Sequence, residues 1–140
     1  MKIMGLDLGL KTLGVAISDS LEMFSNGYPT IRFKYKDFNS AIDELLKVID
    51  DNNVEEIVLG LPKNMDGTLG EQAQITLEFK KMLEEKINIK IELLDERLTT
   101  KIGLSNMIYG NESKKTRHDE IDSAAAKVIL QDYLDKKRRK

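Results

Sequence analysis

The chain has 140 residues, a net charge of −2, no cysteine and a single histidine. This length suits one domain with a sizeable core, and we expect a single domain over residues 1–140. Without cysteines there can be no disulfide or thiolate zinc site, and one histidine excludes a histidine cluster, so any metal must be held by oxygen ligands, which favour Mg²⁺ or Mn²⁺.

No apolar run is long enough to span a membrane, and an aspartate at position 7 interrupts any secretory signal, so we expect a cytoplasmic protein. The acidic balance argues against sequence-independent binding of nucleic acid. Basic residues nevertheless cluster at Lys114, Lys115 and Arg117 and again at Lys136–Lys140. A polyanion would therefore have to meet local patches, although the terminal cluster fits a solvated helix end equally well.

The first third of the chain predicts strands. Short apolar runs cover Lys2–Asp7, Leu13–Asp19 and Tyr28–Phe33. The first two are joined by a short segment containing Gly9, and the third follows Ser25-Asn26-Gly27, a hairpin turn signal. Short connections of this kind favour a three-stranded antiparallel meander.

Helices and strands alternate after the meander. The spacing of apolar residues predicts helices over Asp37–Asp51, Ile75–Leu83, Thr100–Ile108 and Glu120–Lys136, and strands over Glu55–Gly60 and Ile89–Glu96. Leu61–Gly70 and Asn111–Asp119 are expected to be long loops, which are often functional. This order predicts an α/β fold: a mixed five-stranded sheet, with the meander extended by parallel strands and helices on both faces.

Two acidic residues stand where the pattern calls for apolar ones. Asp7 ends an apolar strand within Gly5-Leu6-Asp7-Leu8-Gly9, where burial is costly unless the carboxylate binds a cation or accepts hydrogen bonds from the turn. Asp122 begins an inward-facing helical stripe that continues through Ala125, Ala126 and Ile129. Its alternative role is to sit in the first turn of the helix and favour the helix dipole.

A third acidic position follows the last predicted strand. Asp95 and Glu96 are neighbours and point to opposite faces, so only one of them can join a shared site, and periodicity does not choose between them. Together, three carboxylates at strand ends and a helix start suit two hard cations about 4 Å apart, an arrangement that hydrolyses phosphodiesters.

Several motifs resemble the YqgF/RuvX family, in the family's order and across almost the whole chain. They are Gly5–Asp19 (GLDLGLKTLGVAISD), Gly60–Thr68 (GLPKNMDGT), Asp95–Thr100 (DERLTT) and Ile121–Ala126 (IDSAAA) with its continuation Ile129–Asp135 (ILQDYLD). The family is associated with Holliday junction resolution and with the maturation of the 5′ end of bacterial pre-16S rRNA. The resemblance implies an RNase H-like fold, which agrees with the predicted element order.

The resemblance also implies roles for individual residues. It makes Asp7, Glu96 and Asp122 the catalytic carboxylates that bind Mg²⁺ or Mn²⁺, and it prefers Glu96 to Asp95. Lys11, Arg97 and Thr99 match motif positions suited to contacting phosphate or orienting the carboxylates. Asn64 would flank the substrate groove, and Lys114 and Lys115 belong to a stretch that is usually basic in the family and would contact the substrate.

Two departures from the family and superfamily pattern stand out. Gly60-Leu61-Pro62 occupies the end of the fourth strand, where many superfamily nucleases carry an acid, so the second ligand must come from the next strand. The stretch before Asp122 carries Asp119 and Glu120 among its basic residues, which would weaken substrate binding.

The sequence therefore predicts a metal-dependent nuclease, with pre-rRNA favoured as substrate and branched DNA second, acting as a monomer or weak homodimer. A resolvase would need two copies to cut two strands symmetrically. Other classes fit less well. The glycine-containing hairpin around Asp7 resembles that of actin-like ATPases, which need two such domains. A non-catalytic nucleic-acid-binding adaptor would have little reason to keep three costly carboxylates.

Overall fold

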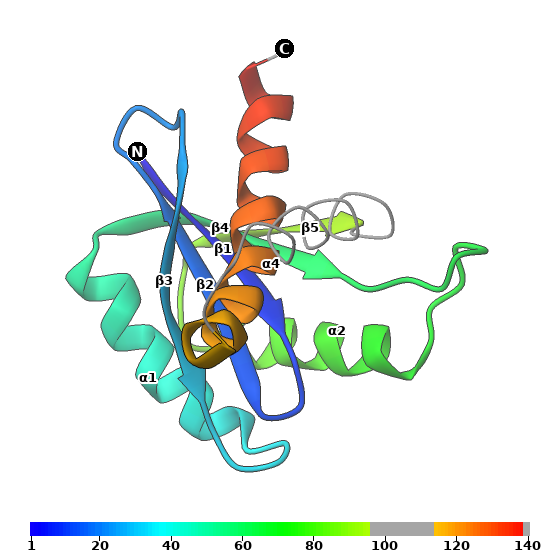
Figure 1. Cartoon of the computed structure of the whole chain (residues 1–140). Coiled ribbons are helices and arrows are strands. Elements are labelled where there is room, and N and C mark those ends of the chain that lie inside the picture. The colour runs from blue at the N-terminus through cyan, green and yellow to red at the C-terminus, as the bar shows by residue number, and fades with distance from the viewer. Residues whose placement is uncertain (96–113, 139–140) are drawn as a thin grey trace.

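The computed structural model describes residues 1–95 and 114–138, with the side chains of 114–123 excepted. A five-stranded sheet has the order β3-β2-β1-β4-β5 (Figure 1). Its strands are β1 (Lys2–Leu8), β2 (Thr12–Ser18), β3 (Ser25–Arg32), β4 (Val54–Leu61) and β5 (Lys90–Asp95). The first three form an antiparallel meander, and β4 and β5 run parallel to β1. The predicted mixed sheet is confirmed.

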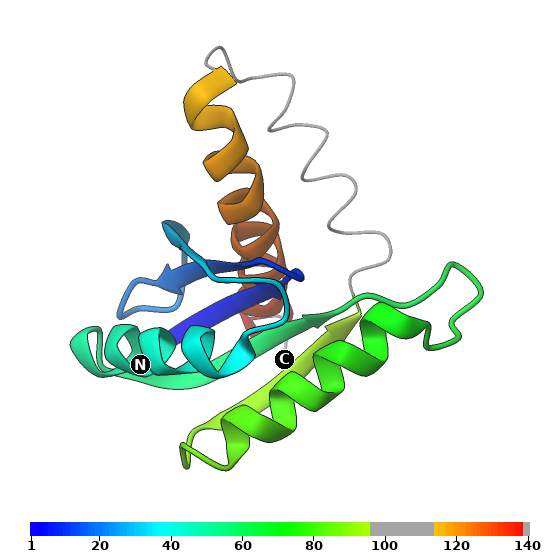
Figure 2. The ribbon, with the colours of Figure 1, turned by 90° about the horizontal axis from the view of Figure 1, so that it is seen from below.

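Helices cover both faces of this sheet, as predicted. Figure 2 shows α1 (Phe38–Asp51) and α2 (Glu71–Glu84) on one face and α4 (Lys114–Arg138) on the other. Strand alternation divides the core accordingly: Met4, Leu6 and Leu8 of β1 pack with α1 and α2, whereas Ile3 packs with α4. None of the helices in the described residues is long and apolar enough to cross a membrane.

The predicted start of the third strand is wrong. β3 begins at Ser25, so the supposed turn signal Ser25-Asn26-Gly27 lies inside the strand, paired with β2. The turn comes earlier, where the carboxylate of Asp19 accepts hydrogen bonds from the backbone N–H groups of Met23 and Phe24 at 2.9 and 2.8 Å. These two bonds lower the pKa of Asp19, and the bond from Phe24 has the larger effect. An aspartate that serves its own backbone in this way makes a turn without glycine.

The last helix also begins earlier than predicted. α4 starts at Lys114, so residues 114–119 of the expected loop are helical. Lysine and arginine are good helix formers, and residues 114–119 contain neither glycine nor proline, so the helix can extend back to Lys114. The predicted helix Thr100–Ile108 and the last residue of the predicted strand Ile89–Glu96 lie outside the described residues.

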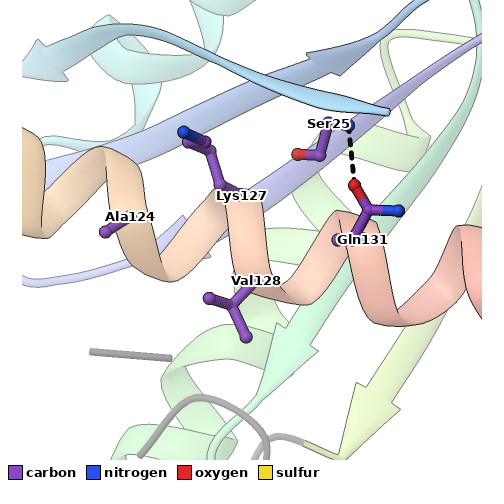
Figure 3. A pocket seen from close by; sticks show the side chains of 5 residues that line it. All are labelled: Ser25, Ala124, Lys127, Val128 and Gln131. Carbon is purple, nitrogen blue, oxygen red and sulfur yellow. Dashed lines mark hydrogen bonds between the residues drawn. The ribbon is translucent and has the colours of Figure 1, made fainter. Parts of the chain in front are cut away.

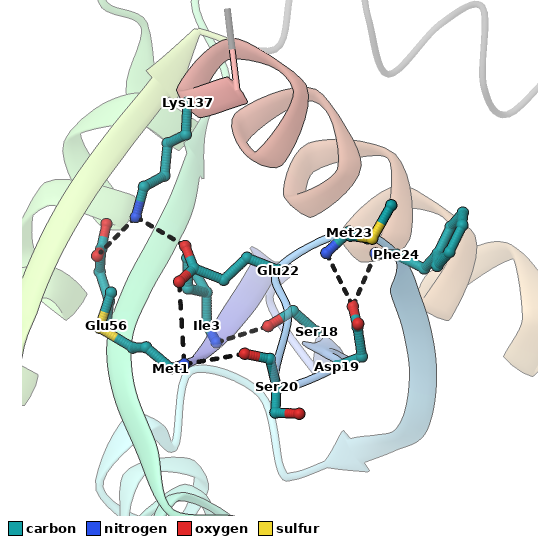
Figure 4. Close-up of polar contacts among 10 residues, drawn as sticks. All are labelled: Met1, Ile3, Ser18, Asp19, Ser20, Glu22, Met23, Phe24, Glu56 and Lys137. Carbon is teal, nitrogen blue, oxygen red and sulfur yellow. Dashed lines mark hydrogen bonds and ion pairs between the residues drawn. The ribbon is translucent and has the colours of Figure 1, made fainter. Parts of the chain in front are cut away.

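Three side chains of α4 fix the helix in place. The side chain of Gln131 accepts a hydrogen bond from the backbone N–H of Ser25 at 2.9 Å, at the start of β3 (Figure 3). Near the C-terminal end of the helix, Lys137 bridges Glu22 and the buried Glu56, at 3.1 and 3.3 Å (Figure 4). The hydroxyl of Tyr133 donates to Glu56 as well. Burial is the main cause that raises the pKa of Tyr133, and this hydrogen bond is the second. The orientation of α4 is thus set by specific polar groups.

Earlier along the helix, at Ala126 and Leu130, α4 lies against a glycine of β1. A Cβ atom on Gly5 would come 2.7 Å from Cβ of Leu130 and 2.9 Å from the carbonyl oxygen of Ala126. Both obstacles belong to the backbone or its first side-chain atom, so neither can rotate away. Only glycine at this position lets the helix approach so closely.

Gly5→Ala is therefore expected to destabilise the protein, because the helix must shift outward to admit one methyl group. We expect the free energy of unfolding to fall by about 1–3 kcal/mol, the usual cost of overpacking a core. Urea denaturation followed by circular dichroism measures it. Lys47→Ala, on the exposed face of α1, serves as a control that should change the value by less than about 0.5 kcal/mol. An unchanged midpoint for Gly5→Ala would contradict the close approach of α4.

Candidate functional site

Asp7 lies where the sequence predicts it, at the second-to-last position of β1. It is partly exposed and alternates with Ile3 and Gly5, which puts it on the sheet face that α4 covers. Its partner on β2 is Gly14, and Gly60 follows the β4 residue that pairs with Leu6. Asp7 is therefore flanked on both neighbouring strands by residues without side chains. Sequence reasoning missed this flanking, since it depends on register.

The path of α4 relates Asp122 to Asp7. Tyr133 and Lys137 bind Glu56, which pairs with Ile3, whereas Ala126 lies against Gly5, so α4 runs antiparallel to β1. Asp122 is in the third turn of α4, too far from the first turn to be stabilised by the helix dipole. That alternative role for Asp122 is wrong. Its side chain is not among those described.

The face of Asp95 follows from the register of β5. Asp95 pairs with Leu61 of β4. Ile91 points to the same face of β5 as Asp95, and it packs into the core beneath α1 and α2. Leu94, by contrast, packs in the core beneath α4. Asp95 thus lies on the opposite face from Asp7, and its carboxylate is 3.8 Å from Nζ of Lys63. Glu96, Arg97 and Thr99 lie outside the described residues.

Two predicted substrate contacts lie at the same end of the sheet. Lys11 is exposed in the β1–β2 turn, which is closed by the bond from Gly9 N–H to the Thr12 carbonyl at 2.8 Å. Asn64 is exposed in the loop after β4, but its side chain donates to the Thr68 hydroxyl at 3.0 Å, and Asp66 binds the same hydroxyl. The side chain of Asn64 therefore stabilises the conformation of this loop. Lys114 and Lys115 are in the first turn of α4, and their side chains are not described.

Acid, histidine and cysteine side chains in the described part of the chain form no group of three that could hold a metal. Of the predicted carboxylates only Asp7 has a described side chain, so the set of three ligands stays a prediction. The basic residues at the end of α4 pair with acids. Lys136 and Arg138 pair with Asp132 and Asp135 on their own helix, and Lys137 pairs with Glu22 and Glu56. Because these cations are already paired with acids, the pairing favours interpreting the basic cluster as a helix end, and not as a surface that binds a polyanion.

Solved structures with a similar arrangement define the fold. Thermus thermophilus RuvC in complex with a Holliday junction substrate superposes with a TM-score of 0.61 over 99% of this chain and 96% of that one, at 13% identity. The Fowlpox virus resolvase in complex with Holliday junction DNA gives a TM-score of 0.60 over 97% and 98%, also at 13% identity. At this identity the likeness concerns the fold, which is RNase H-like, as the sequence predicted.

Closer relatives give the family. The family model described as "RuvX: Holliday junction resolvase" matches residues 1–136. A Clostridium botulinum (strain Alaska E43) protein is 47% identical over 136 residues, covering 97% of this chain and 98% of its own length. An Oceanobacillus iheyensis protein is 42% identical over 137 residues, covering 98% and 100%. Both are named "Putative pre-16S rRNA nuclease". The chain belongs to the RuvX family and is a nuclease, a hydrolase of phosphodiester bonds, so the predicted family and enzyme class are confirmed.

Proposed function

We propose that this nuclease is an endonuclease that depends on a divalent metal and matures the 5′ end of pre-16S rRNA, with Asp7, Glu96 and Asp122 as its catalytic carboxylates. The observation that carries the proposal is the position of Asp7, at the end of β1 on the α4 face and flanked by Gly14 and Gly60. Neither glycine has a side chain that would block a cation or a phosphodiester from this carboxylate.

The geometry of α4 supports Asp122 as the second ligand. From the contact between Gly5 and Ala126, Asp7 lies two residues further along β1, about 6.6 Å at the usual strand rise. In the same direction Asp122 lies one turn further along the antiparallel helix, about 6 Å at the usual helical rise. Asp7 and Asp122 therefore lie on the same side of this contact, which supports a shared site.

Asp95 lies on the face turned away from Asp7, and this supports Glu96 as the third ligand. Gly60 lies beside Asp7 in the register and has no side chain to offer, so the third carboxylate must come from beyond β4. Of the two adjacent acids after Leu94, Asp95 is held on the opposite face and paired with Lys63. The proposal therefore assigns the role to Glu96.

The donor set fits hard divalent cations, because it consists of carboxylates only and the chain has no cysteine. When bound, Mg²⁺ or Mn²⁺ would supply Lewis-acid activation of water and neutralise charge on the phosphate. Lys11, exposed in the turn that follows Asp7, would bind a neighbouring phosphate and hold the strand across the carboxylates. In this scheme the protein groups position the substrate and carry the negative charge that attracts the cation.

The substrate assignment is supported by the names of the relatives, which call them pre-16S rRNA nucleases. The second candidate is a Holliday junction, supported by the description of the family. A resolvase must cut two strands symmetrically and so requires a dimer, whereas an RNA nuclease can act as a monomer or weak homodimer.

One experiment separates these possibilities. An end-labelled pre-16S 5′ leader RNA and a four-way DNA junction are incubated with the wild type and with Asp122→Asn, in Mn²⁺ or in EDTA. We expect cleavage of the RNA that requires both the metal and Asp122, and Asp43→Asn on the exposed face of α1 serves as the matched control. Cleavage of the junction alone would mean that the substrate is branched DNA and not the rRNA precursor. Cleavage of neither by a folded protein would contradict the proposal and favour an adaptor.

A further inference from the structure

A group of basic and aromatic side chains lies at the end of the sheet that carries Asp7. We call it the basic-aromatic patch: Lys11 in the β1–β2 turn, and Arg32, Lys34, Tyr35 and Lys36 at the end of β3 and in the connection to α1. All five residues are exposed, and 59% of Tyr35 is accessible to solvent. The segment Arg32–Lys36 alternates cations with aromatic rings.

Backbone hydrogen bonds hold the two parts of the patch together. The N–H of Phe33 donates to the carbonyl of Lys11 at 2.9 Å, and the N–H of Lys36 donates to the carbonyl of Leu10 at 2.9 Å. The turn that follows Asp7 and the connection to α1 therefore form one rigid surface. Phe33 anchors this surface, because its ring packs edge-on against Phe38 of α1 with the ring centroids 5.8 Å apart.

The local backbone fixes the exposed position of Tyr35. Lys36 has a positive φ of 58°, a conformation that residues other than glycine rarely adopt, and the N–H of Asp37 closes a turn to the carbonyl of Lys34 at 2.8 Å. Tyr35 is at the centre of this turn. Nζ of Lys36 lies 5.5 Å from the centroid of its ring. The ring is thus presented beside a cation, a combination that suits a nucleobase next to its phosphate.

The charges of the three lysines of the patch are not cancelled by nearby acids. Asp37, the nearest acid in sequence, caps α1: its carboxylate accepts hydrogen bonds from the backbone N–H and the hydroxyl of Ser40. Among the described residues, no ion pair involves Lys11, Lys34 or Lys36. In a chain of net charge −2, this local excess of cations is a surface for a polyanion.

We propose that the basic-aromatic patch binds unpaired nucleotides of the RNA substrate next to the cleavage site, with Tyr35 stacking on a base and Lys11, Lys34 and Lys36 contacting phosphates. This inference rests on the proposed function for the identity of the nucleic acid. A solvent-exposed ring can stack only on a base that is not already stacked inside a duplex, whereas lysines bind the backbone of either form. The patch therefore selects single-stranded flanks.

Binding without catalysis tests this proposal. Fluorescence anisotropy is measured in EDTA with a labelled single-stranded RNA of twelve nucleotides and with a hairpin RNA that is fully paired. We expect Tyr35→Ala to weaken single-strand binding about tenfold and hairpin binding less than twofold, because a stacked base is lost. Tyr35→Phe should restore single-strand binding. Lys34→Gln with Lys36→Gln should weaken it and reduce the slope of log K against log salt by about 1.4.

Matched controls lie elsewhere on the surface. Phe24→Ala removes an exposed ring from the β2–β3 turn. The double variant Lys47→Gln with Lys81→Gln removes two exposed lysines from α1 and α2. The single and the double variant should each bind both RNAs as the wild type does. Wild-type affinity of Tyr35→Ala, or an equal loss for both RNAs, would overturn the proposal. A protein that shows the expected pattern but cleaves no RNA would refute the proposed function and leave the patch standing.

Discussion

Asp7→Asn is expected to reduce metal-dependent cleavage by about 100-fold or more while the protein stays folded. The substitution keeps the size of the side chain and removes its charge, so the loss would report on the cation rather than on packing. A hundredfold loss corresponds to about 2.7 kcal/mol of transition-state stabilisation, within the range that metal ions supply to phosphodiester hydrolysis. Rates are measured on the end-labelled RNA leader with saturating Mn²⁺.

The stability of this variant gives an independent check. If Asp7 lies near other carboxylates, removal of its charge relieves repulsion in the metal-free protein, so the free energy of unfolding in EDTA should be unchanged or higher. Mn²⁺ should stabilise the wild type against urea and should stabilise Asp7→Asn much less, because a ligand that binds only the folded state shifts the unfolding equilibrium. Full activity of a folded Asp7→Asn protein would remove Asp7 from the site.

The sheet could be predicted from the sequence because its signals are local. The apolar runs of the first three strands are joined by short connections, which allow only antiparallel neighbours, and the later strands are separated by helices, which require parallel pairing. Asp7 could be found in the same way, as a charge that interrupts an apolar run. Both inferences depend on residues adjacent in the sequence.

Features that depend on register could not be predicted. Gly14 and Gly60 flank Asp7 only because β2 and β4 pair with β1 in one particular register. The start of β3 was misplaced because a carboxylate, Asp19, makes the turn instead of the glycine that follows it. The basic-aromatic patch forms when the β1–β2 turn binds the segment before α1, and the alternation of cations and rings in Arg32–Lys36 was the only local signal for it.

The second large effect concerns the two adjacent acids that the sequence could not separate. Glu96→Gln is expected to reduce cleavage by about 100-fold or more, and Asp95→Asn by less than about threefold. Asp95 lies on the face of α1 and α2, where its partner is Lys63 at 3.8 Å and both side chains are about one-third exposed. Loss of such a pair costs roughly 0–1 kcal/mol of stability and removes nothing from the face that carries Asp7.

Calorimetric titration with Mn²⁺ separates a ligand from a residue that acts indirectly. Glu96→Gln should weaken Mn²⁺ binding together with cleavage, and Asp95→Asn should bind Mn²⁺ as the wild type does. Since the two variants differ by one position and each replaces an acid by its own amide, general effects of net charge are matched. Loss of Mn²⁺ binding in Asp95→Asn with full activity in Glu96→Gln would mean that the third ligand comes from the opposite face of β5, and the assignment of the site to the α4 face would then be wrong.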